Sequence, residues 1–270
     1  MRIGILTSTD TRHRYFVNAL RRSLNVVAVG YQDTGYVPSR AATADGVDPA
    51  TAAIVTHHFA ERSRQETLFF GHDAAMLPDA PGVRVRRLDK ASLNSNDTVA
   101  FLQSQRVDAV AIYGTSIIKP PLLDAFANRM INMHLGLSPY YRGTATNFYP
   151  LVNEEPQYVG ATIHMIDAGI DSGPILHHAR PDITADDMPH TVGCKAILAG
   201  IETLIRSFRE LAANRLTPVC QWTPAIARLY LRRDYQPAHV VKLYRLIEDG
   251  LFPAYAARKN DVAPRVRLVP

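Results

Sequence analysis

An asparagine and a histidine stand two positions apart, at Asn132 and His134, inside the apolar stretch 130–134. If this stretch is a β-strand, both side chains point to the same face of a sheet. An amide and an imidazole that lie together can polarise a carbonyl group, stabilise a developing oxyanion and transfer a proton. The pair therefore indicates chemistry at a carbonyl carbon. A capping asparagine beside a buried structural histidine is the alternative interpretation.

Two further segments have unusual composition and follow the pair in a fixed order. Residues 136–143 read GLSPYYRG, which predicts a long loop directly after the strand. Residues 161–176 read ATIHMIDAGIDSGPIL, which predicts a strand, a glycine-punctuated loop and a returning strand. The loop carries two aspartates, Asp167 and Asp171.

Taken together, these segments resemble the folate-dependent formyltransferases. That family includes glycinamide ribonucleotide formyltransferase, methionyl-tRNA formyltransferase and the sugar N-formyltransferases. Its pattern is an N-x-H pair, a loop similar to S-L-L-P-x-Y-R-G, and a T-x-H strand that leads to D-x-G. The resemblance is strong over residues 108–176 and weak elsewhere. The loop departs from the pattern, because residues 135–139 read LGLSP and the second leucine is displaced.

The resemblance implies that a formyl group moves from 10-formyltetrahydrofolate to an amine, with Asn132, His134 and Asp171 as catalytic residues. Asn132 and a protonated His134 would stabilise the oxyanion of the tetrahedral intermediate. Asp171 would keep His134 charged and, through a water, accept the proton of the amine. Asp167 is a nearby competitor for this role. We expect no metal ion.

The resemblance also implies where the ligands bind. Two loops are expected to contact the folate, mainly through their backbones: Tyr113, Gly114, Ser116, Ile117 and Ile118 in one, and Asp167, Gly169 and Ile170 in the other. Residues assigned to the substrate are Tyr141, Arg142 and Gly143. Core packing is the alternative for Ile117 and Ile118, and fixing the loop is the alternative for Arg142.

The elements that must position these residues are strands and helices in alternation. Apolar runs predict strands over 2–7, 26–29, 83–88 and 109–112, with helices over 14–24, 97–105 and 191–211. This order predicts an α/β fold with a Rossmann-like, mostly parallel sheet and a small C-terminal extension. The first strand is followed by TSTDT at 7–11, which lacks the glycines of a dinucleotide-binding turn. We therefore exclude nicotinamide chemistry.

The amino-acid composition changes after Asn214, where prolines and aromatic residues become frequent. We expect a catalytic domain over 1–214 and a small extension over 215–270, whose end is mobile from about Arg258. Aromatic residues of the extension could stack on a base or a sugar, and its arginines could meet a diphosphate: Trp222, Tyr230, Tyr235, Arg228, Arg232 and Arg233. Packing of the extension onto the core is the alternative.

The composition is that of an ordinary globular protein, with 47% hydrophobic and 20% charged residues. The formal net charge is +5, but the basic residues are dispersed, so we do not expect nucleic acid as a partner. No membrane-length apolar run or secretory signal is evident. The two isolated cysteines, Cys194 and Cys220, fit a reducing compartment, and we expect a cytoplasmic protein.

The sequence constrains the identity of the acceptor amine less than it constrains the reaction. We expect a small primary amine, with an amino sugar nucleotide preferred over a hydroxyornithine-type or other secondary-metabolite amine. Methionyl-tRNA is a further alternative, although the segment after Asn214 is shorter than the tRNA-binding domain of the resembling enzymes. The non-enzyme alternative is a catalytically silent protein that binds folate or a nucleotide. A homodimer remains open.

Overall fold

The computed structural model describes residues 1–33, 46–79 and 81–270. Seven strands form one sheet in the order β3-β2-β1-β4-β5-β7-β8. The strands are β1 (Ile3–Thr7), β2 (Val26–Gln32), β3 (Arg84–Leu88), β4 (Ala109–Tyr113), β5 (Met130–His134), β7 (Ala161–Met165) and β8 (Ile175–Ala179). The first five are mutually parallel, whereas β7 and β8 run antiparallel to their neighbours. The prediction of an α/β fold with a mostly parallel sheet is confirmed.

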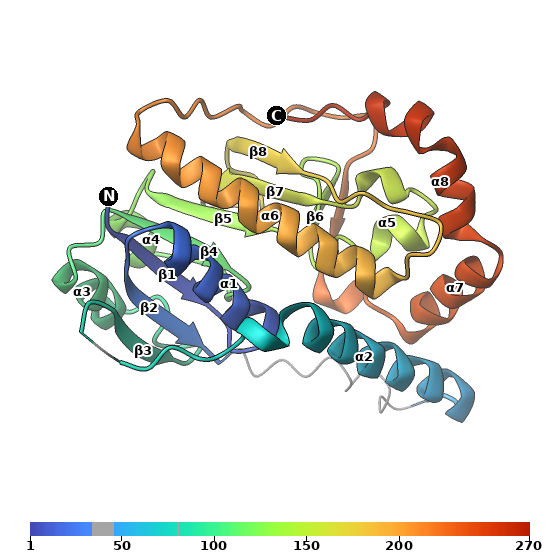
Figure 1. Cartoon of the computed structure of the whole chain (residues 1–270), viewed down its shortest axis with the longest axis horizontal. Helices are drawn as coiled ribbons and strands as arrows, with labels where there is room; N and C mark the ends of the chain where they lie inside the picture. The colour runs from blue at the N-terminus through green and yellow to red at the C-terminus, as the bar shows by residue number, and fades with distance from the viewer. Residues whose placement is uncertain (34–45, 80) are drawn as a thin grey trace.

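Helices cover both faces of this sheet (Figure 1). Helices α1 (Thr11–Ser23) and α6 (Pro189–Ala212) cover one face, where Phe16, Leu20 and Leu204 are fully buried. Helices α3 (Asn96–Ser104) and α4 (Leu122–Ala125) cover the other, where Leu102 and Leu122 are fully buried. Strands β1, β2 and β4 are therefore buried on both sides, as in doubly wound sheets, whereas the edge strand β3 is largely exposed.

A long helix, α2, was not evident from the sequence. It covers Pro49–Phe70, 22 residues, and begins where the Asp48 carboxylate accepts the N–H groups of Ala50 and Thr51. Its apolar residues are spread around the helix and form no single stripe, so periodicity does not reveal it. Helix α2 packs against α6 and against α7 (Pro237–Glu248) of the extension (Figure 1). Residues 34–45, also in the insertion that follows β2, lie outside the described residues.

The residues after 214 pack closely on the rest of the chain. Strand β9 (Arg228–Tyr230) pairs with β6 (Tyr141–Gly143) in a separate two-stranded sheet. Helices α7 and α8 (Leu251–Val262) share one apolar cluster with α5 (Tyr149–Val152) and α6. Short 3-10 turns complete the secondary structure at 71–73, 156–158, 232–234 and 263–265. The boundary at residue 214 stays a prediction.

The end of the chain is held in place, contrary to our expectation of mobility from Arg258. Helix α8 continues to Val262, and Val266 is buried. Beyond it, the Val269 carbonyl accepts the backbone N–H of His178, and the Val269 N–H donates to Nδ1 of the same histidine, each at 2.8 Å. The last residues therefore pair with the outer edge of strand β8.

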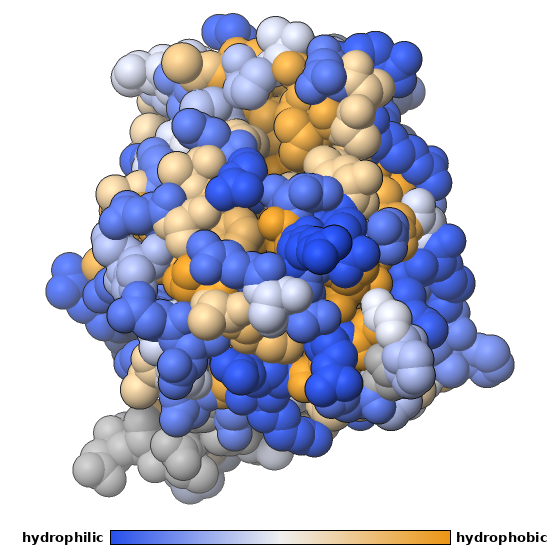
Figure 2. All heavy atoms as spheres, turned by 90° about the vertical axis from the view of Figure 1, so that its left-hand side faces the viewer, coloured by the Kyte–Doolittle hydropathy of each residue, from blue (hydrophilic) through white to orange (hydrophobic). Residues whose placement is uncertain are grey.

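Figure 2 shows the molecule from the side on which α3 lies in Figure 1. Hydrophilic residues dominate this face, and smaller apolar areas lie between them, as on ordinary protein surfaces. Within residues 1–33, 46–79 and 81–270, no helix combines the length and apolarity needed to cross a bilayer.

Candidate active site

A cavity of about 1020 Å³ opens where strands β1, β4 and β5 end. Carboxyl ends of parallel strands are the usual ligand-binding edge of such sheets. Its wall includes most of the residues that the sequence singled out, namely Tyr113, Gly114, Ser116, Ile117, Ile118, Asn132, His134, Gly143, Asp167, Gly169, Ile170 and Asp171. Three predicted loops and one strand thus converge on one space.

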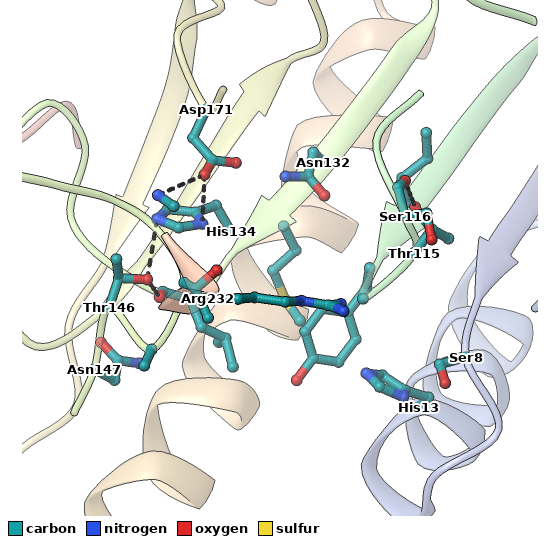
Figure 3. Close-up of a pocket in the computed structure, with 18 of the residues that line it drawn as sticks. Ser8, His13, Thr115, Ser116, Asn132, His134, Thr146, Asn147, Asp171 and Arg232 are labelled. Carbon is teal, nitrogen blue, oxygen red and sulfur yellow. Dashed lines mark hydrogen bonds and ion pairs between the residues drawn. The ribbon is translucent and has the colours of Figure 1, made fainter. Parts of the chain in front are cut away.

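Asn132 and His134 lie on β5 and both line the cavity, as their spacing predicts. They pair in register with His164 and Thr162 of the antiparallel strand β7. His134 is buried, whereas Asn132 is partly exposed. Figure 3 shows both side chains directed toward the same region, with Asp171 beside His134.

Asp171 is the aspartate that contacts the histidines. Its Oδ2 lies 3.3 Å from Nδ1 of His134, and its Oδ1 lies 3.6 Å from Nε2 of His164. The residue has a positive φ of 47°, which turns its side chain out of the loop toward β5. Asp167 instead accepts hydrogen bonds from within its own loop, from the Gly169 N–H and from the Ser172 hydroxyl. The geometry thus selects Asp171 over Asp167 as the aspartate beside His134.

Gly143 holds the other side of Asp171. Its backbone N–H donates to Oδ2 of Asp171 at 2.9 Å. Its φ is +93°, and an added Cβ would lie 2.1 Å from the carbonyl oxygen of Tyr230. Only glycine therefore fits between strand β9 and the loop that carries Asp171, and this position contributes to the site through its backbone N–H.

The imidazole of His134 is enclosed by hydrogen-bond acceptors. Its Nε2 lies 3.1 Å from the carbonyl oxygen of Tyr141 and 3.3 Å from the hydroxyl oxygen of Thr146. That hydroxyl donates its own proton to the Leu135 carbonyl. Both ring nitrogens thus face groups that accept, namely Asp171 on one side and a carbonyl on the other, and only the doubly protonated ring donates to both.

Burial and these acceptors act on the proton of His134 in opposite directions. Burial lowers the pKa of His134 below its usual value, while Asp171 and the Tyr141 carbonyl raise it. Burial alone would raise the pKa of Asp171, but His134, His164 and the Gly143 N–H together hold it well below its ordinary range. Asp171 is therefore a carboxylate at neutral pH, and His134 sits beside it as a group that can gain and lose a proton.

His164 links the asparagine to this pair. Its Nδ1 donates to the carbonyl of Met165 at 2.8 Å, so in the neutral ring Nε2 is an acceptor. Nδ2 of Asn132 lies 3.1 Å from that nitrogen and donates to it. The amide carries two N–H groups, so one stays available to a ligand in the cavity.

The loop after β4 is fixed at both ends. The Gln32 side chain accepts the backbone N–H of Ser116 at 2.7 Å and donates to its hydroxyl. Asn94 donates to the Ile117 carbonyl and accepts the N–H of Lys119. The side chain of Ile117 is left 56% exposed in the cavity wall, so core packing does not explain it.

Ile118, the next residue, and Ile170, on the facing loop, differ in how far they are exposed. Ile118 is only 5% exposed and packs with the core, as the alternative interpretation allowed. Ile170, on the aspartate loop, is 37% exposed and lines the cavity like Ile117. Each predicted folate loop therefore presents one exposed isoleucine to the cavity.

Two residues assigned to the substrate do not reach the cavity wall. The Tyr141 ring is fully buried, and its hydroxyl donates to the Glu155 carboxylate and accepts from Asn153. Arg142 is absent from the lining of the cavity, which of the three assigned residues includes Gly143 alone. The Tyr141 carbonyl still contacts His134, so the segment acts through its backbone.

One part of the cavity was missed from the sequence, the side formed by the β1–α1 turn, α2 and α6. Arg12, in the first turn of α1, forms ion pairs with Asp10 at 2.8 Å and with Glu66 at 2.9 Å. Arg62 of α2 reaches the same Glu66 carboxylate at 2.9 Å. The i, i+4 spacing of His58, Arg62 and Glu66 places them on one helix face, which is the signal that could have revealed this wall.

The extension contributes a further part of the wall. Residues of β9 and the turn after it line the cavity, namely Tyr230, Leu231, Arg232 and Tyr235. Figure 3 shows Arg232 extending between His134 and the side of the cavity on which Ser8 lies. Trp222 lies elsewhere, packed against Tyr140 and under the Arg267 guanidinium. In the part of the chain that the structure describes, no cluster of three or more His, Cys, Asp or Glu side chains could hold a metal ion.

Fold and cavity together define an α/β enzyme with a carboxylate–imidazole–amide site at the carboxyl edge of its sheet. Residues 18–207 match the model of the family described as formyl transferase. Because this match covers well over half of the sequence, the chain belongs to the formyl transferase family.

Curated relatives carry the same kind of name. The chain is 27% identical over 225 residues to the methionyl-tRNA formyltransferase of Synechococcus elongatus, covering 80% of this chain and 67% of that protein. It is 33% identical over 167 residues to the methionyl-tRNA formyltransferase of Thermodesulfovibrio yellowstonii, covering 59% of this chain and 52% of that protein. The chain thus spans about half to two thirds of the length of these relatives.

Solved structures show the same fold. Phosphoribosylglycinamide formyltransferase from Anaplasma phagocytophilum superposes with a TM-score of 0.57 at 15% identity, covering 86% of this chain and 98% of that chain. A sugar N-formyltransferase from Shewanella sp. FDAARGOS_354 superposes with a TM-score of 0.55 at 17% identity, covering 91% and 87%. At such identities the likeness concerns the fold alone.

Proposed function

We propose that this enzyme is an N-formyltransferase that moves the formyl group of 10-formyltetrahydrofolate to a primary amine on a nucleotide-linked sugar. The observation that carries the proposal is the meeting of Asn132, His134 and Asp171 in one cavity with two different walls. One wall presents exposed apolar side chains from two anchored loops. The other presents aromatic and cationic side chains of residues 230–235.

The first wall suits a pterin. A flat, polar-edged ring needs apolar surfaces on its faces and backbone groups at its edge. Exposed Ile117 and Ile170 supply such surfaces, and the backbone around Gly114 and Gly169 supplies the polar groups. The loop that carries Ile117 is held by Gln32 and Asn94, so its shape is set before a ligand arrives.

The catalytic residues then have separable tasks. The amine attacks the formyl carbon and loses one proton, while the bond from that carbon to the folate nitrogen breaks and the released nitrogen takes up one proton. Asn132 donates its second N–H to the oxygen that becomes negative, and His134 in its protonated form adds a charged donor. Asp171 favours that protonated form and, through a water, accepts the proton of the amine.

The second wall suits a sugar nucleotide. Tyr235 can lie against a base or a sugar face, and the planar guanidinium of Arg232 matches phosphate oxygens. Tyr230 also lines the cavity, but one face of its ring is stacked on Tyr149, with the ring centroids 3.6 Å apart. In this proposal residues 1–214 are the catalytic domain, and residues 215–270 complete its acceptor side. The aromatic and cationic content of this wall favours an amino sugar nucleotide over a small hydroxyornithine-type amine.

The test is an acceptor panel assayed with 10-formyltetrahydrofolate, with released tetrahydrofolate as the readout. The panel contains nucleotide-linked 4-aminohexoses, N-hydroxyornithine and methionyl-tRNA. We expect turnover with an amino sugar nucleotide at a kcat/KM of about 10⁴ M⁻¹s⁻¹ or more. Efficient formylation of methionyl-tRNA, with every amino sugar rejected, would refute the acceptor while retaining the reaction.

A further inference from the structure

Two histidines from different helices face each other in the wall of the cavity, away from the catalytic residues. His58 belongs to α2, and His190 lies in the first turn of α6. Their ring centroids are 4.4 Å apart with the planes inclined by 56°. Both side chains line the cavity, although only 5% of His58 and 8% of His190 is exposed.

Each ring has a buried nitrogen that no described group satisfies. Within the described residues, Nδ1 of His58 and Nε2 of His190 are fully buried and have no hydrogen-bond partner. Leaving a buried polar atom unpaired costs about 1–3 kcal/mol, so proteins rarely do so without a functional reason. Two such atoms on facing rings indicate a place where a ligand completes the hydrogen bonds.

The protonation of the pair limits which ligand fits. Burial lowers the pKa of His58 to about 3 and that of His190 to about 4, so both rings are neutral near pH 7. A neutral ring carries one proton on one of its two nitrogens, so each unpaired nitrogen either accepts a hydrogen bond or donates one, according to the tautomer of its ring.

The fixed charges beside the pair cancel. Arg12 and Arg62 both bind the Glu66 carboxylate, and Arg12 also binds Asp10, so two cations meet two anions. No surplus positive charge remains in this cluster to attract a phosphate or a carboxylate.

We infer that His58 and His190 form a subsite that binds hydroxyl groups of the acceptor sugar. One hydroxyl meets Nε2 of His190 and a neighbouring hydroxyl meets Nδ1 of His58, and each donates or accepts as the tautomer of that ring allows. The subsite would thus read the hydroxyl pattern of the sugar, whereas Arg232 faces its phosphates. This inference rests on the proposed function, because it presumes a sugar acceptor.

The test compares His190→Phe and His58→Phe with the wild type, using a nucleotide-linked 4-amino-4,6-dideoxyhexose as the probe. Phenylalanine keeps the ring and removes the nitrogens. We expect KM for the probe to rise about tenfold, the loss of roughly one hydrogen bond, with kcat within about threefold. The Kd of 5-formyltetrahydrofolate should stay within about twofold, which also reports that the variants are folded.

Three controls sharpen the test. His57→Phe alters the neighbouring exposed histidine, which does not line the cavity, and should leave KM unchanged. His190→Gln restores an acceptor and should recover part of the loss. Probes lacking the 2-hydroxyl or the 3-hydroxyl should identify the hydroxyl that is bound, because the wild type and His190→Phe then use that analogue equally well.

The outcomes separate this inference from the proposed function. If the wild type uses the probe and both phenylalanine variants keep its KM within about twofold, the subsite is refuted and the proposed function stands. Equal losses with the hydroxylated and both deoxygenated probes also refute it. If the wild type uses no amino sugar nucleotide, the proposed acceptor is wrong and the subsite falls with it.

Discussion

The carboxylate of Asp171 is the group on which the geometry of His134 depends. Its Oδ2 lies 3.3 Å from the imidazole on one side and accepts the Gly143 N–H on the other, and its Oδ1 lies 3.6 Å from His164. An amide at this position would keep the shape but remove the negative charge. The charge, and not the bulk, is therefore what catalysis should need.

We expect Asp171→Asn to reduce kcat by about 10²–10⁴, the range for loss of a general acid–base group, with the fold retained. The measurement is kcat at saturating donor and acceptor, beside a circular dichroism spectrum. Asp167→Asn is the matched control, because that side chain bonds only within its own loop and an asparagine can still accept there. Comparable losses in both variants would contradict the assignment.

The sequence alone could predict the positions of some site residues and not of others. Asn132 and His134 share a strand face, and a period of two is enough to predict that both reach the same edge. Asp171 and Asp167 stand in one loop, and the positive φ that turns the first toward His134 is not legible from residue types. Tyr141 belongs to the loop motif, but its ring points into the core while its carbonyl serves the site.

Among the elements, the paired strands β6 and β9 place the strictest limit on a side chain. Gly143 lies where the backbone of β9 leaves no room for a side chain, and it has the left-handed φ that glycine tolerates. The same residue donates to Asp171. The backbone of Gly143 therefore both packs against the extension and orients the Asp171 carboxylate.

Gly143→Ala should lower the free energy of unfolding by about 1–3 kcal/mol, because the added methyl group adds strain and collides with the Tyr230 carbonyl. Urea unfolding measures this change. Gly193→Ala is the control, since that position lies in α6, lines the cavity and has nothing within 4 Å of an added Cβ. The control should be neutral or slightly stabilising. This interpretation of the β6–β9 pairing is wrong if both variants lower the free energy of unfolding by the same amount.

The strands of the seven-stranded sheet and the helices α1, α3 and α6 could be predicted because their apolar residues follow a simple pattern. Parallel strands buried on both faces appear as continuous apolar runs, and α6 shows a clear apolar stripe. Helix α2 escaped prediction because it contacts the core, the extension and the cavity on different sides, so its apolar residues follow no single face. The wall that carries His58 and Arg62 was missed with it.

For the molecule as a whole, His178 ties the last residues to the sheet. Its Nε2 donates to the Ser138 carbonyl and its Nδ1 accepts from the Val269 N–H, each at 2.8 Å. Both bonds fit only the neutral ring. Burial, as the main cause, lowers the pKa of His178 to about 4.

Protonation of His178 should therefore weaken the fold in mild acid. Between about pH 6.5 and pH 4 the unfolded chain binds a proton that the folded chain does not, so stability falls as pH falls, by up to about 1.4 kcal/mol per pH unit. His178→Gln can donate and accept in the same places without titrating, and should flatten the decline of Tm. His57→Gln, at an exposed position, should leave the slope unchanged. An unaltered slope in His178→Gln would contradict this role.

Transfer of a labelled formyl group tests the central claim most directly. The protein is incubated with 10-[¹³C]formyltetrahydrofolate and an amino sugar nucleotide, and the products are identified by mass spectrometry and ¹³C NMR. We expect the label to appear as a formamide carbon on the sugar nitrogen, together with an equal amount of tetrahydrofolate. The account would be contradicted if the donor is bound but the label stays on the folate or appears only as free formate with every amine of the panel.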